Sequence, residues 1–323
     1  MLKYNIHNLV KIESNIDFGL PKVFKVDNIE NVDLTVNAGR FNPNFFGASD
    51  NVYCFESGSS LLRFTSQISD IFGKTKIAYS GPRGFVRKKT INNMINTVVS
   101  WKLLMKNHAL VYGDCLEKDG KGVLIIGPSG VGKTLTSLHL LTQHDFNYLG
   151  NDEIILSNAN VAYSYPIAFK MRPKHLETFN ISLSTKEQFI FYLRNNLRRF
   201  PFFCFISESF VDTDRLPCDV NIKNCAKIER IYWLEQNGDA IEETKSEYVL
   251  NQYLSLNLFY WWWLWSKNIQ LCGYLTHTNN KVYLGDLISS MEQTIKSTFD
   301  KSKCFIVKDN HGKWYRKIMQ DFE

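Results

Sequence analysis

The segment from Gly127 to Thr134, hereafter the phosphate loop, has the residue types and spacing of a phosphate-binding motif. It reads Gly-Pro-Ser-Gly-Val-Gly-Lys-Thr and fits the pattern G-x-x-x-x-G-K-[ST] at every fixed position. Glycines let the backbone turn so that successive N–H groups point at phosphate oxygens. Lys133 would contact the outer phosphates, and the Thr134 hydroxyl would bind Mg²⁺. The sequence therefore predicts a nucleoside triphosphate site, with contacts from Gly127, Pro128, Ser129, Gly130, Val131, Gly132, Lys133, Thr134 and Leu135.

The segments on either side of the phosphate loop supply the context that the motif needs. The apolar run at residues 123–126 predicts a strand, and residues 135–141 favour a helix. The helix N-terminus adds partial positive charge where phosphates would lie. This context disfavours the alternative of a glycine-rich turn without a ligand.

The segment upstream of the loop distinguishes this chain from common phosphate-loop proteins. Residues 108–112 read as a strand, Asp119 and Gly120 form a hairpin turn signal, and residues 122–126 form the return strand. The strand before the loop should therefore pair antiparallel with its immediate predecessor. Ras-like and RecA-like proteins place that strand inside a mostly parallel sheet. The pattern indicates another kind of phosphate-loop protein.

An acidic partner for the loop is the next feature that the chemistry requires. The usual second motif is an apolar strand that ends in Asp. Here the nearest acid, Asp152, instead precedes the apolar run 154–156. Residues 202–208 imitate the usual pattern and stay as a rival metal site, with a buried strand as the alternative.

Composition limits the functional class. The chain has 323 residues, 44% hydrophobic and 22% charged, which is typical of a globular protein. A net charge of +6 does not require a nucleic-acid partner, and Arg87 to Lys89 is the nearest approach to a basic arm. No helicase or AAA motifs accompany the loop, which disfavours a nucleic-acid motor. Seven cysteines without a C-x-x-C pair favour reduced thiols in a cytoplasmic protein over a disulfide frame or a zinc site. The first residues have no signal-peptide character.

Periodicity predicts the remaining elements. Residues up to about 85 are β-rich, with strands at 51–56 and 61–64. A helix should begin at Thr90 with an apolar face of Ile91, Met94, Ile95, Val98 and Val99, which Leu103 and Met105 extend. A capping box of Ser184 and Glu187 should open a second helix with an apolar face of Phe189, Ile190, Leu193 and Leu197. A strand at 228–235, a helix at 242–265, and strands near Val282 and Phe305 with a helix between them complete the chain.

The region from His108 to Leu156 resembles the HPr kinase/phosphorylase group. His108-Ala-Leu-Val lies where that group has His-Gly or His-Ala, and residues 122–134 match its loop and the strand before it. Asn151 and Asp152 stand where the group has Asp-Asp after the loop helix. Residues 226–235 are similar to a later strand of the group that ends in Leu-Glu.

The resemblance implies a fold and a reaction. These kinases transfer phosphate to a serine hydroxyl and are akin to phosphoenolpyruvate carboxykinase. The expected fold is α/β: a phosphate-loop kinase core with a mixed sheet at 89–323, after a β-rich region at 1–88. The resemblance implies ATP and Mg²⁺ as cofactors, Asp152 as general base, Lys133 as phosphate-contacting cation, and His108 hydrogen-bonded near Asp152. Its implied metal ligands are Thr134, Asp152 and Glu177.

The chain also departs from the group. Asn151 replaces the first Asp, and the surroundings of Glu177 do not match the group's signature. The Gly-Arg-Asn loop linked to phosphorolysis is not found, which favours kinase over phosphorylase activity. The N-terminal region does not look like the group's usual one, so HPr is disfavoured as the substrate. Shorter relatives that tailor ribosomally made peptides, such as lasso-peptide precursors, are closer in build.

Two segments are candidates for acceptor contacts. Lys170 and Arg172 could bind phosphates or an acidic substrate, and a solvated loop is the alternative. The aromatic cluster at 259–265 could form a peptide-binding wall, a homo-oligomer patch or a membrane-surface contact, with core packing as the commonest explanation. Asn251, Gln252 and Asn257 interrupt its apolar stretch, so no transmembrane span is expected.

Three functions follow from these features. The leading one is an ATP-dependent kinase that phosphorylates a serine-type hydroxyl on a peptide or protein. A kinase of a small-molecule alcohol shares the nucleotide chemistry, and the sequence does not separate the two. A nucleotide-dependent switch or binding protein without an acceptor is the third. A structural role for His108 and a turn role for Asp152 remain open at this point.

Overall fold

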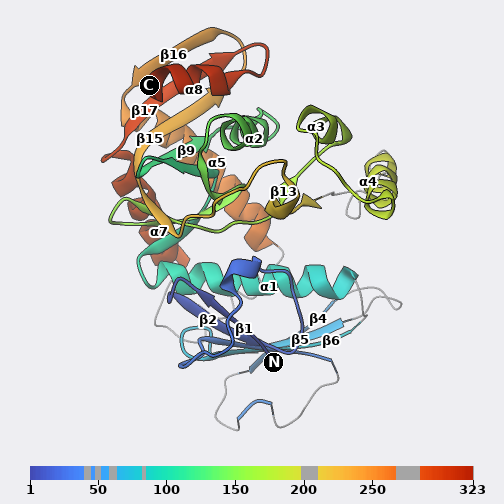
Figure 1. The fold of residues 1–323 in the computed structure, drawn as a ribbon. Coiled ribbons are helices and arrows are strands. Elements are labelled where there is room, and N and C mark those ends of the chain that lie inside the picture. Colours follow the sequence, from blue (N-terminus) through green and yellow to red (C-terminus); the bar gives the residue numbers. More distant parts are fainter. Residues whose placement is uncertain are drawn as a thin grey trace. The chain divides into compact units, whose positions relative to one another are not determined.

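A computed structural model of the chain shows two units (Figure 1). Unit 1 comprises residues 1–109 and 258–293, and unit 2 comprises 110–257 and 294–323. The structure describes residues 1–39, 45–47, 52–57, 64–81, 85–197, 210–266 and 284–322. The rival metal site at 202–208 and the strand expected near Val282 lie outside these residues, as do the side chains of the 259–265 cluster.

Unit 1 contains a six-stranded sheet with the strand order β1-β2-β3-β6-β5-β4. Alternating residues of its first strands, such as Tyr4, Ile6, Ile12 and Val36, have no exposed surface, because strand side chains alternate between the two faces of a sheet. The expected β-rich N-terminal region is therefore confirmed. The strands are β1 (Leu2–Ile6), β2 (Val10–Ser14), β3 (Leu34–Ala38), β4 (Val52–Ser57), β5 (Phe64–Ser69) and β6 (Thr75–Ser80).

Helix α1 (Phe85–Leu104) follows this sheet and is grouped with it in unit 1. It begins before the expected start at Thr90. The predicted apolar positions from Met94 to Leu103 are buried. Met105 lies beyond the end of the helix and is 38% exposed. The sequence boundary at residue 88 assigned this helix to the second domain, whereas the two structural units assign it to the first.

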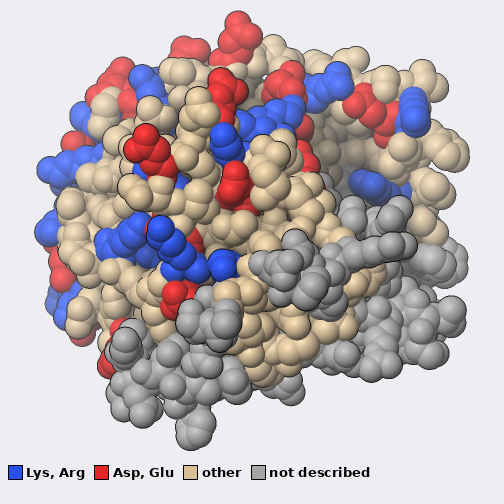
Figure 2. Space-filling model, turned by 90° about the horizontal axis from the view of Figure 1, so that it is seen from below, with Lys and Arg blue, Asp and Glu red and all other residues tan. Residues whose placement is uncertain are grey.

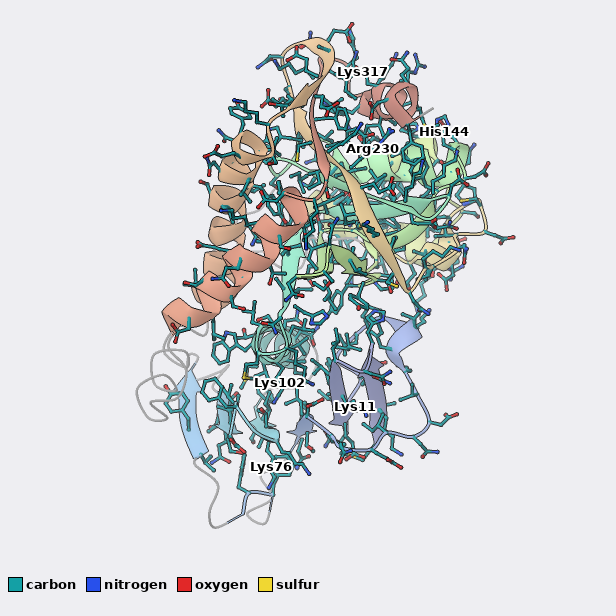
Figure 3. All side chains as sticks on the ribbon, turned by 90° about the vertical axis from the view of Figure 1, so that its left-hand side faces the viewer. Lys11, Lys76, Lys102, His144, Arg230 and Lys317 are labelled. Atoms are coloured by element: carbon teal, nitrogen blue, oxygen red, sulfur yellow. The ribbon has the colours of Figure 1, made fainter. Side chains whose placement is uncertain are left out.

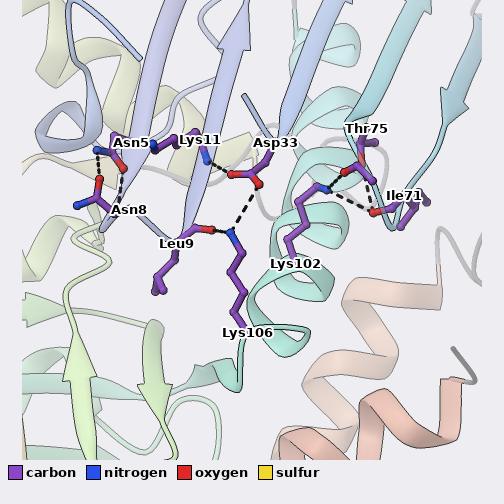
Figure 4. Close-up of polar contacts among 10 residues, drawn as sticks. Asn5, Asn8, Leu9, Lys11, Asp33, Ile71, Thr75, Lys102 and Lys106 are labelled. Atoms are coloured by element: carbon purple, nitrogen blue, oxygen red, sulfur yellow. Dashed lines mark hydrogen bonds and ion pairs between the residues drawn. The ribbon is translucent and has the colours of Figure 1, made fainter. Parts of the chain in front are cut away.

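Two lysines near the end of α1 bind main-chain carbonyls in the turns that connect strands of the sheet (Figure 4). Lys102 is buried, and its Nζ donates to the carbonyl oxygens of Gly73 at 2.7 Å and Ile71 at 3.3 Å. Lys106 donates to the carbonyl of Leu9 and lies 3.6 Å from Asp33. Burial lowers the pKa of Lys102 to about 8, an effect that the nearby carboxylates oppose.

Unit 2 contains a nine-stranded mixed sheet, as the fold class predicted. Its centre is parallel, because β15 pairs with β9 on one side and β17 on the other. The pairs β8–β9, β12–β15 and β16–β17 are antiparallel. The strands are β7 (His108–Tyr112), β8 (Asp114–Lys118), β9 (Lys121–Ile126), β10 (Asn147–Gly150), β11 (Glu153–Ser157), β12 (Val161–Tyr163), β15 (Cys225–Glu235), β16 (Asp239–Thr244) and β17 (Lys303–Asp309).

The hairpin before the phosphate loop is confirmed, but its first strand differs from the prediction. Asp119 and Gly120 have φ values of 53° and 82°, the left-handed conformation that a tight hairpin turn needs. The strand that pairs with β9 is β8, not the expected 108–112 strand. The chain bends at Gly113, where a Cβ atom would lie 3.0 Å from Ile126. The expected 108–112 strand is β7, and after this bend an additional strand, β8, takes its place as the partner of β9.

Helices cover both faces of the unit 2 sheet (Figures 1 and 3). On one face α2 and α8 share an apolar cluster with the sheet. On the other, α5 and α7 contact one another through Tyr253 stacked on Phe299 at 5.3 Å. The elements β13, α3, α4 and β14 lie between β12 and β15 in the chain and are not part of this sheet. The helices are α2 (Lys133–Gln143), α3 (Pro173–Thr178), α4 (Thr185–Leu197), α5 (Ser246–Ser266), α7 (Leu284–Phe299) and α8 (Trp314–Phe322), with β13 (Phe169–Lys170) and β14 (Phe210–Val211) as a small separate sheet.

One expectation for the C-terminal region was wrong, and one helix was missed. Residues 242–244, expected at the start of a helix, end strand β16, because their backbone pairs with β17. Helix α8 was not predicted.

None of the helices in the described ranges combines the length and the apolar character that a membrane crossing requires. On the face drawn in Figure 2, positive and negative side chains are interspersed.

Helix α4 begins where predicted, but the face that it buries differs from the predicted one. The Ser184 main-chain N–H donates to the Glu187 carboxylate at 2.9 Å, which confirms the capping box. Phe191 is the buried side chain, whereas Phe189, Ile190 and Leu193 are 68%, 36% and 46% exposed. At about 100° per residue these three positions point away from Phe191. Anchoring through Phe191 therefore turns the expected apolar face outward.

The buried Lys102 makes a prediction about stability and pH. Between pH 8 and 10.5 the unfolded chain holds a proton that folded unit 1 has released, so the stability of unit 1 should rise with pH across this window. Lys102→Met lacks this gain, which is up to about 3 kcal/mol. Hydrogen exchange of β6 and α1 at about pH 7 and about pH 9.5, corrected for intrinsic rates, measures the difference. Lys76→Met on β6 is the matched control and should keep the wild-type dependence.

Candidate functional site

The phosphate loop connects β9 to α2 in the predicted strand–loop–helix arrangement. Gly132, the last residue before α2, has a φ of 123°, which non-glycine residues rarely adopt. A Cβ atom at this position would lie 2.5 Å from the ring of Trp314. Both the conformation and the space at position 132 therefore require glycine.

Lys133 begins α2 and is only 4% exposed. Its Nζ donates to the carbonyl oxygens of Gly127 at 2.9 Å and Pro128 at 3.2 Å. It also donates to the Tyr112 hydroxyl at 3.0 Å and lies 4.4 Å from the centroid of that ring. Burial lowers the pKa of Lys133, while the charges of Asp114 and Asp152 act in the opposite direction. The lysine is thus held over the loop by partners from several elements.

Tyr112, at the end of β7, is a site residue that the sequence did not reveal. Its main-chain N–H donates to Asn257 Oδ1 at 3.0 Å, and its carbonyl accepts from the Tyr253 hydroxyl at 2.6 Å. Both partners lie on α5 and have no exposed surface. Burial, together with the charges of Asp152 and Asp114, raises the pKa of Tyr112, which keeps the phenol protonated. Helix α5 therefore fixes the tyrosine that meets Lys133.

The turn between β10 and β11 brings Asn151 and Asp152 to the start of α2. Asn151 is fully buried, and its Oδ1 accepts from the Thr134 hydroxyl at 3.0 Å. Asp152 follows with a φ of 65° and is partly exposed. The hydrogen bond between Asn151 and Thr134 therefore connects the turn that carries Asp152, the predicted acidic partner, to the phosphate loop.

A second carboxylate, Asp114, lies next to the Asp152 turn, and the sequence did not identify it as a site residue. It has no exposed surface. Its Oδ2 accepts from the Ser137 hydroxyl at 2.8 Å, and its Oδ1 accepts from the Asp152 main-chain N–H at 3.0 Å. Burial and the Asp152 charge raise the pKa of Asp114 to about 7, against the effect of Lys133. A polar residue directly after a glycine break in a hydrophobic segment is the one signal that could have pointed to it.

His108 lies at the opposite end of β7 from Tyr112. Its Nδ1 is 2.6 Å from the carbonyl oxygen of Lys106, and the ring is partly exposed. A role beside Asp152 stays a prediction. The β7 residue that contacts Lys133 is Tyr112, four positions later.

Oxygen donors for a hard cation such as Mg²⁺ are present around α2. Thr134, Asn151 and Asp152 supply a hydroxyl, an amide oxygen and a carboxylate, which suit that ion. Glu177, the third predicted ligand, is an exposed residue of α3. Within the described ranges, no group of three or more His, Cys, Asp or Glu side chains is placed to hold a metal. The metal assignment of Glu177 therefore stays a prediction.

The predicted acceptor residues Lys170 and Arg172 lie on either side of the short β13–α3 connection. Both side chains are exposed. Their role in binding a substrate stays a prediction.

Helix α8 forms a wall beside the phosphate loop. Asp309 Oδ1 accepts from the main-chain N–H groups of His311 at 2.7 Å and Lys313 at 3.0 Å, which orders the turn before α8. The Trp314 indole N–H then donates to the Glu235 carbonyl at 3.0 Å. This bond holds the ring against Gly132.

Comparison with known proteins finds similarity to the same group that the sequence resembles. No protein-family model matches the chain. A segment of 68 residues is 38% identical to the HPr kinase/phosphorylase of Malacoplasma penetrans (strain HF-2), and it covers 21% of this chain. The match spans 22% of that protein. Among solved structures, the HPr(Ser) kinase/phosphatase from Coxiella burnetii aligns over 42% of this chain and 75% of its own, with 15% identity and a TM-score of 0.23.

The contact of Gly132 with Trp314 gives a test of the loop. Gly132→Ala should weaken binding of Mg²⁺–ATP by roughly tenfold or more, because backbone strain and the ring contact displace the loop N–H groups. Gly120→Ala is the matched control: its φ is 82°, but a Cβ atom there meets nothing within 4 Å. That variant should keep wild-type affinity. Isothermal titration calorimetry measures both, and equal affinities would contradict the assignment of the loop as the nucleotide site.

Proposed function

We propose that this protein is an ATP-dependent kinase of the HPr-kinase type that phosphorylates a serine-type hydroxyl on a peptide or protein. The observation that carries the proposal is the carboxylate of Asp152, held beside the phosphate loop. Asn151 links the turn to Thr134, and Asp114 binds the Asp152 main chain. The 68-residue similarity to an HPr kinase/phosphorylase supports the same conclusion.

The reaction needs a base that reaches the acceptor and a cation that reaches the phosphates. The acceptor oxygen forms a bond to the γ-phosphorus, the bond from that phosphorus to the bridging oxygen breaks, and ADP leaves. The hydroxyl proton passes to Asp152, which is partly exposed and able to meet a substrate. Asp114, the neighbouring carboxylate, is fully buried and cannot. This difference in burial supports Asp152 over Asp114 as the base.

Lys133 and the main-chain N–H groups of the loop would stabilise the negative charge of the transferred phosphoryl group. The transition state spreads negative charge over the phosphoryl oxygens, and preorganised donors stabilise it most in a site that excludes water. Burial lowers the pKa of Lys133, and the charges of Asp114 and Asp152 act against this shift and favour the charged form. Mg²⁺ held by Thr134 and its neighbours would neutralise further phosphate charge.

Phosphate transfer from γ-labelled ATP to candidate precursor peptides encoded near the gene tests the proposal. We expect label on a peptide serine with the wild-type protein. Asp152→Asn should lose roughly 10²–10⁴ in transfer rate, because the amide cannot accept the proton, while ATP binding is kept. Lys133→Ala should lose both transfer and productive ATP use.

Three results would count against this function. An effect of Asp152→Asn within a few-fold would remove it as the base. Wild-type turnover by Lys133→Ala would remove the phosphate loop as the nucleotide site. Tight ATP binding without label on any peptide would favour a small-molecule alcohol as acceptor, or a nucleotide-dependent switch.

The role of His108 has its own prediction. His108→Ala should reduce transfer less than Asp152→Asn, because a residue that tunes the base matters less than the base itself. Steady-state rates of both variants under one set of conditions decide the order. The reverse order would mean that the two roles are misassigned.

A further inference from the structure

We propose that Asp114 is a positioning residue, whose buried carboxylate fixes the Asp152 turn against the phosphate-loop helix. This inference deepens the proposed function and rests on it, because Asp152 matters as the base of that reaction. Asp114 has no exposed surface and so cannot meet a substrate hydroxyl. Its role must be exerted through the residues that it holds.

The main chain of Asp152 is bound from both sides by two consecutive residues. Asp114 Oδ1 accepts from the Asp152 N–H at 3.0 Å, and the Gly113 N–H donates to the Asp152 carbonyl at 3.3 Å. With a φ of 65°, Asp152 occupies a region that few non-glycine residues adopt. Such a conformation persists where surrounding contacts determine it. The bend at residues 113–114 therefore sets the direction in which the Asp152 side chain leaves the turn.

The second oxygen of Asp114 extends the connection to α2. Oδ2 accepts from the Ser137 hydroxyl at 2.8 Å, one turn after Thr134. Thr134 itself donates to Asn151 at 3.0 Å. Two parallel links thus join the helix to the turn, one direct and one through Asp114. Together they fix the distance between the proposed base and the phosphate loop.

The burial of Asp114 fits the same arrangement. Asp114 brings a buried carboxyl group to the turn, and both of its oxygens accept hydrogen bonds. A buried carboxylate is tolerated when donors and an opposite charge surround it. Asp114 has two hydrogen-bond donors and the nearby ammonium of Lys133, whose charged form it favours. The polar atoms of Asp114 are therefore satisfied in the position where it is buried.

The test separates position from charge through two substitutions of Asp114. Asp114→Ala removes both acceptors and should lower kcat on the order of 10²-fold, because a small displacement of a reacting group has this effect. KM for ATP should change by only a few-fold, since the phosphate loop keeps its own contacts. Asp114→Asn keeps an acceptor for the Asp152 N–H and can donate to Ser137. It should recover kcat to within about tenfold of wild type.

Ser137→Ala serves as the matched control. It breaks the link to α2 but leaves the Asp152 N–H bound to Asp114, so a loss of only a few-fold is expected. Residue-resolved hydrogen exchange of the Asp152 amide provides a readout that does not need activity. Exchange should accelerate by about tenfold or more in Asp114→Ala and stay near wild type in Asp114→Asn and Ser137→Ala.

The possible results separate this inference from the proposed function. Wild-type protein that transfers no phosphate would overturn the proposed function, and hydrogen exchange would still decide whether Asp114 holds the turn. A protected Asp152 amide or wild-type kcat in Asp114→Ala would overturn the positioning role. If Asp114→Ala does not fold, Asp114→Asn decides: a loss on the order of 10²-fold would overturn the role, because its acceptor geometry is kept.

Discussion

A buried cation is the constraint on which the rest of unit 2 depends. Lys133 is the first residue of α2 and is almost fully buried. Removing an ammonium from water is strongly unfavourable unless acceptors and opposite charges replace the water. Loop carbonyls supply some of these acceptors, and the Tyr112 hydroxyl supplies another. The fold must therefore bring distant segments to one point.

The order of strands in the unit 2 sheet meets this requirement. Strands β10, β8 and β9 are neighbours, so the turn after β10, the start of β8 and the loop after β9 lie close together. Asp152, Asp114 and the phosphate loop come from these three places. Tyr112 comes from the end of β7 and is fixed by α5. The antiparallel β8–β9 hairpin thus contributes to the site as well as to the sheet.

Local sequence signals predicted the parts of the structure that local chemistry determines. The phosphate loop needs glycines with positive φ, the hairpin turn needs Asp119 and Gly120, and the start of α4 needs its capping box. Each of these signals depends on residues within a few positions of one another, and each was confirmed. The mixed sheet was also predicted, as the fold that the resemblance implied, and the hairpin signal indicated the antiparallel partner of β9.

The remaining features depend on contacts between distant segments. Which face of α4 is buried depends on the surface that receives Phe191, and apolar spacing alone does not contain that information. Residues 242–244 form a strand because β17 offers a free edge, although their composition permits a helix. Tyr112 and Asp114 belong to no motif. Their importance follows from the bend at Gly113, which directs one toward Lys133 and the other toward Asp152.

The two carboxylates of the site differ in the property that decides their chemistry, which is access to solvent. A proton acceptor must touch the group that loses the proton, and a group that only orients its neighbours works best without solvent. Asp152 is partly exposed and Asp114 is fully buried, although one hydrogen bond joins them. Burial of Asp114 raises its pKa, and its bonds to Ser137 and to the Asp152 N–H act against that rise. The contacts that keep the Asp114 carboxyl group in place therefore lie away from solvent, whereas the Asp152 side chain stays partly accessible to it.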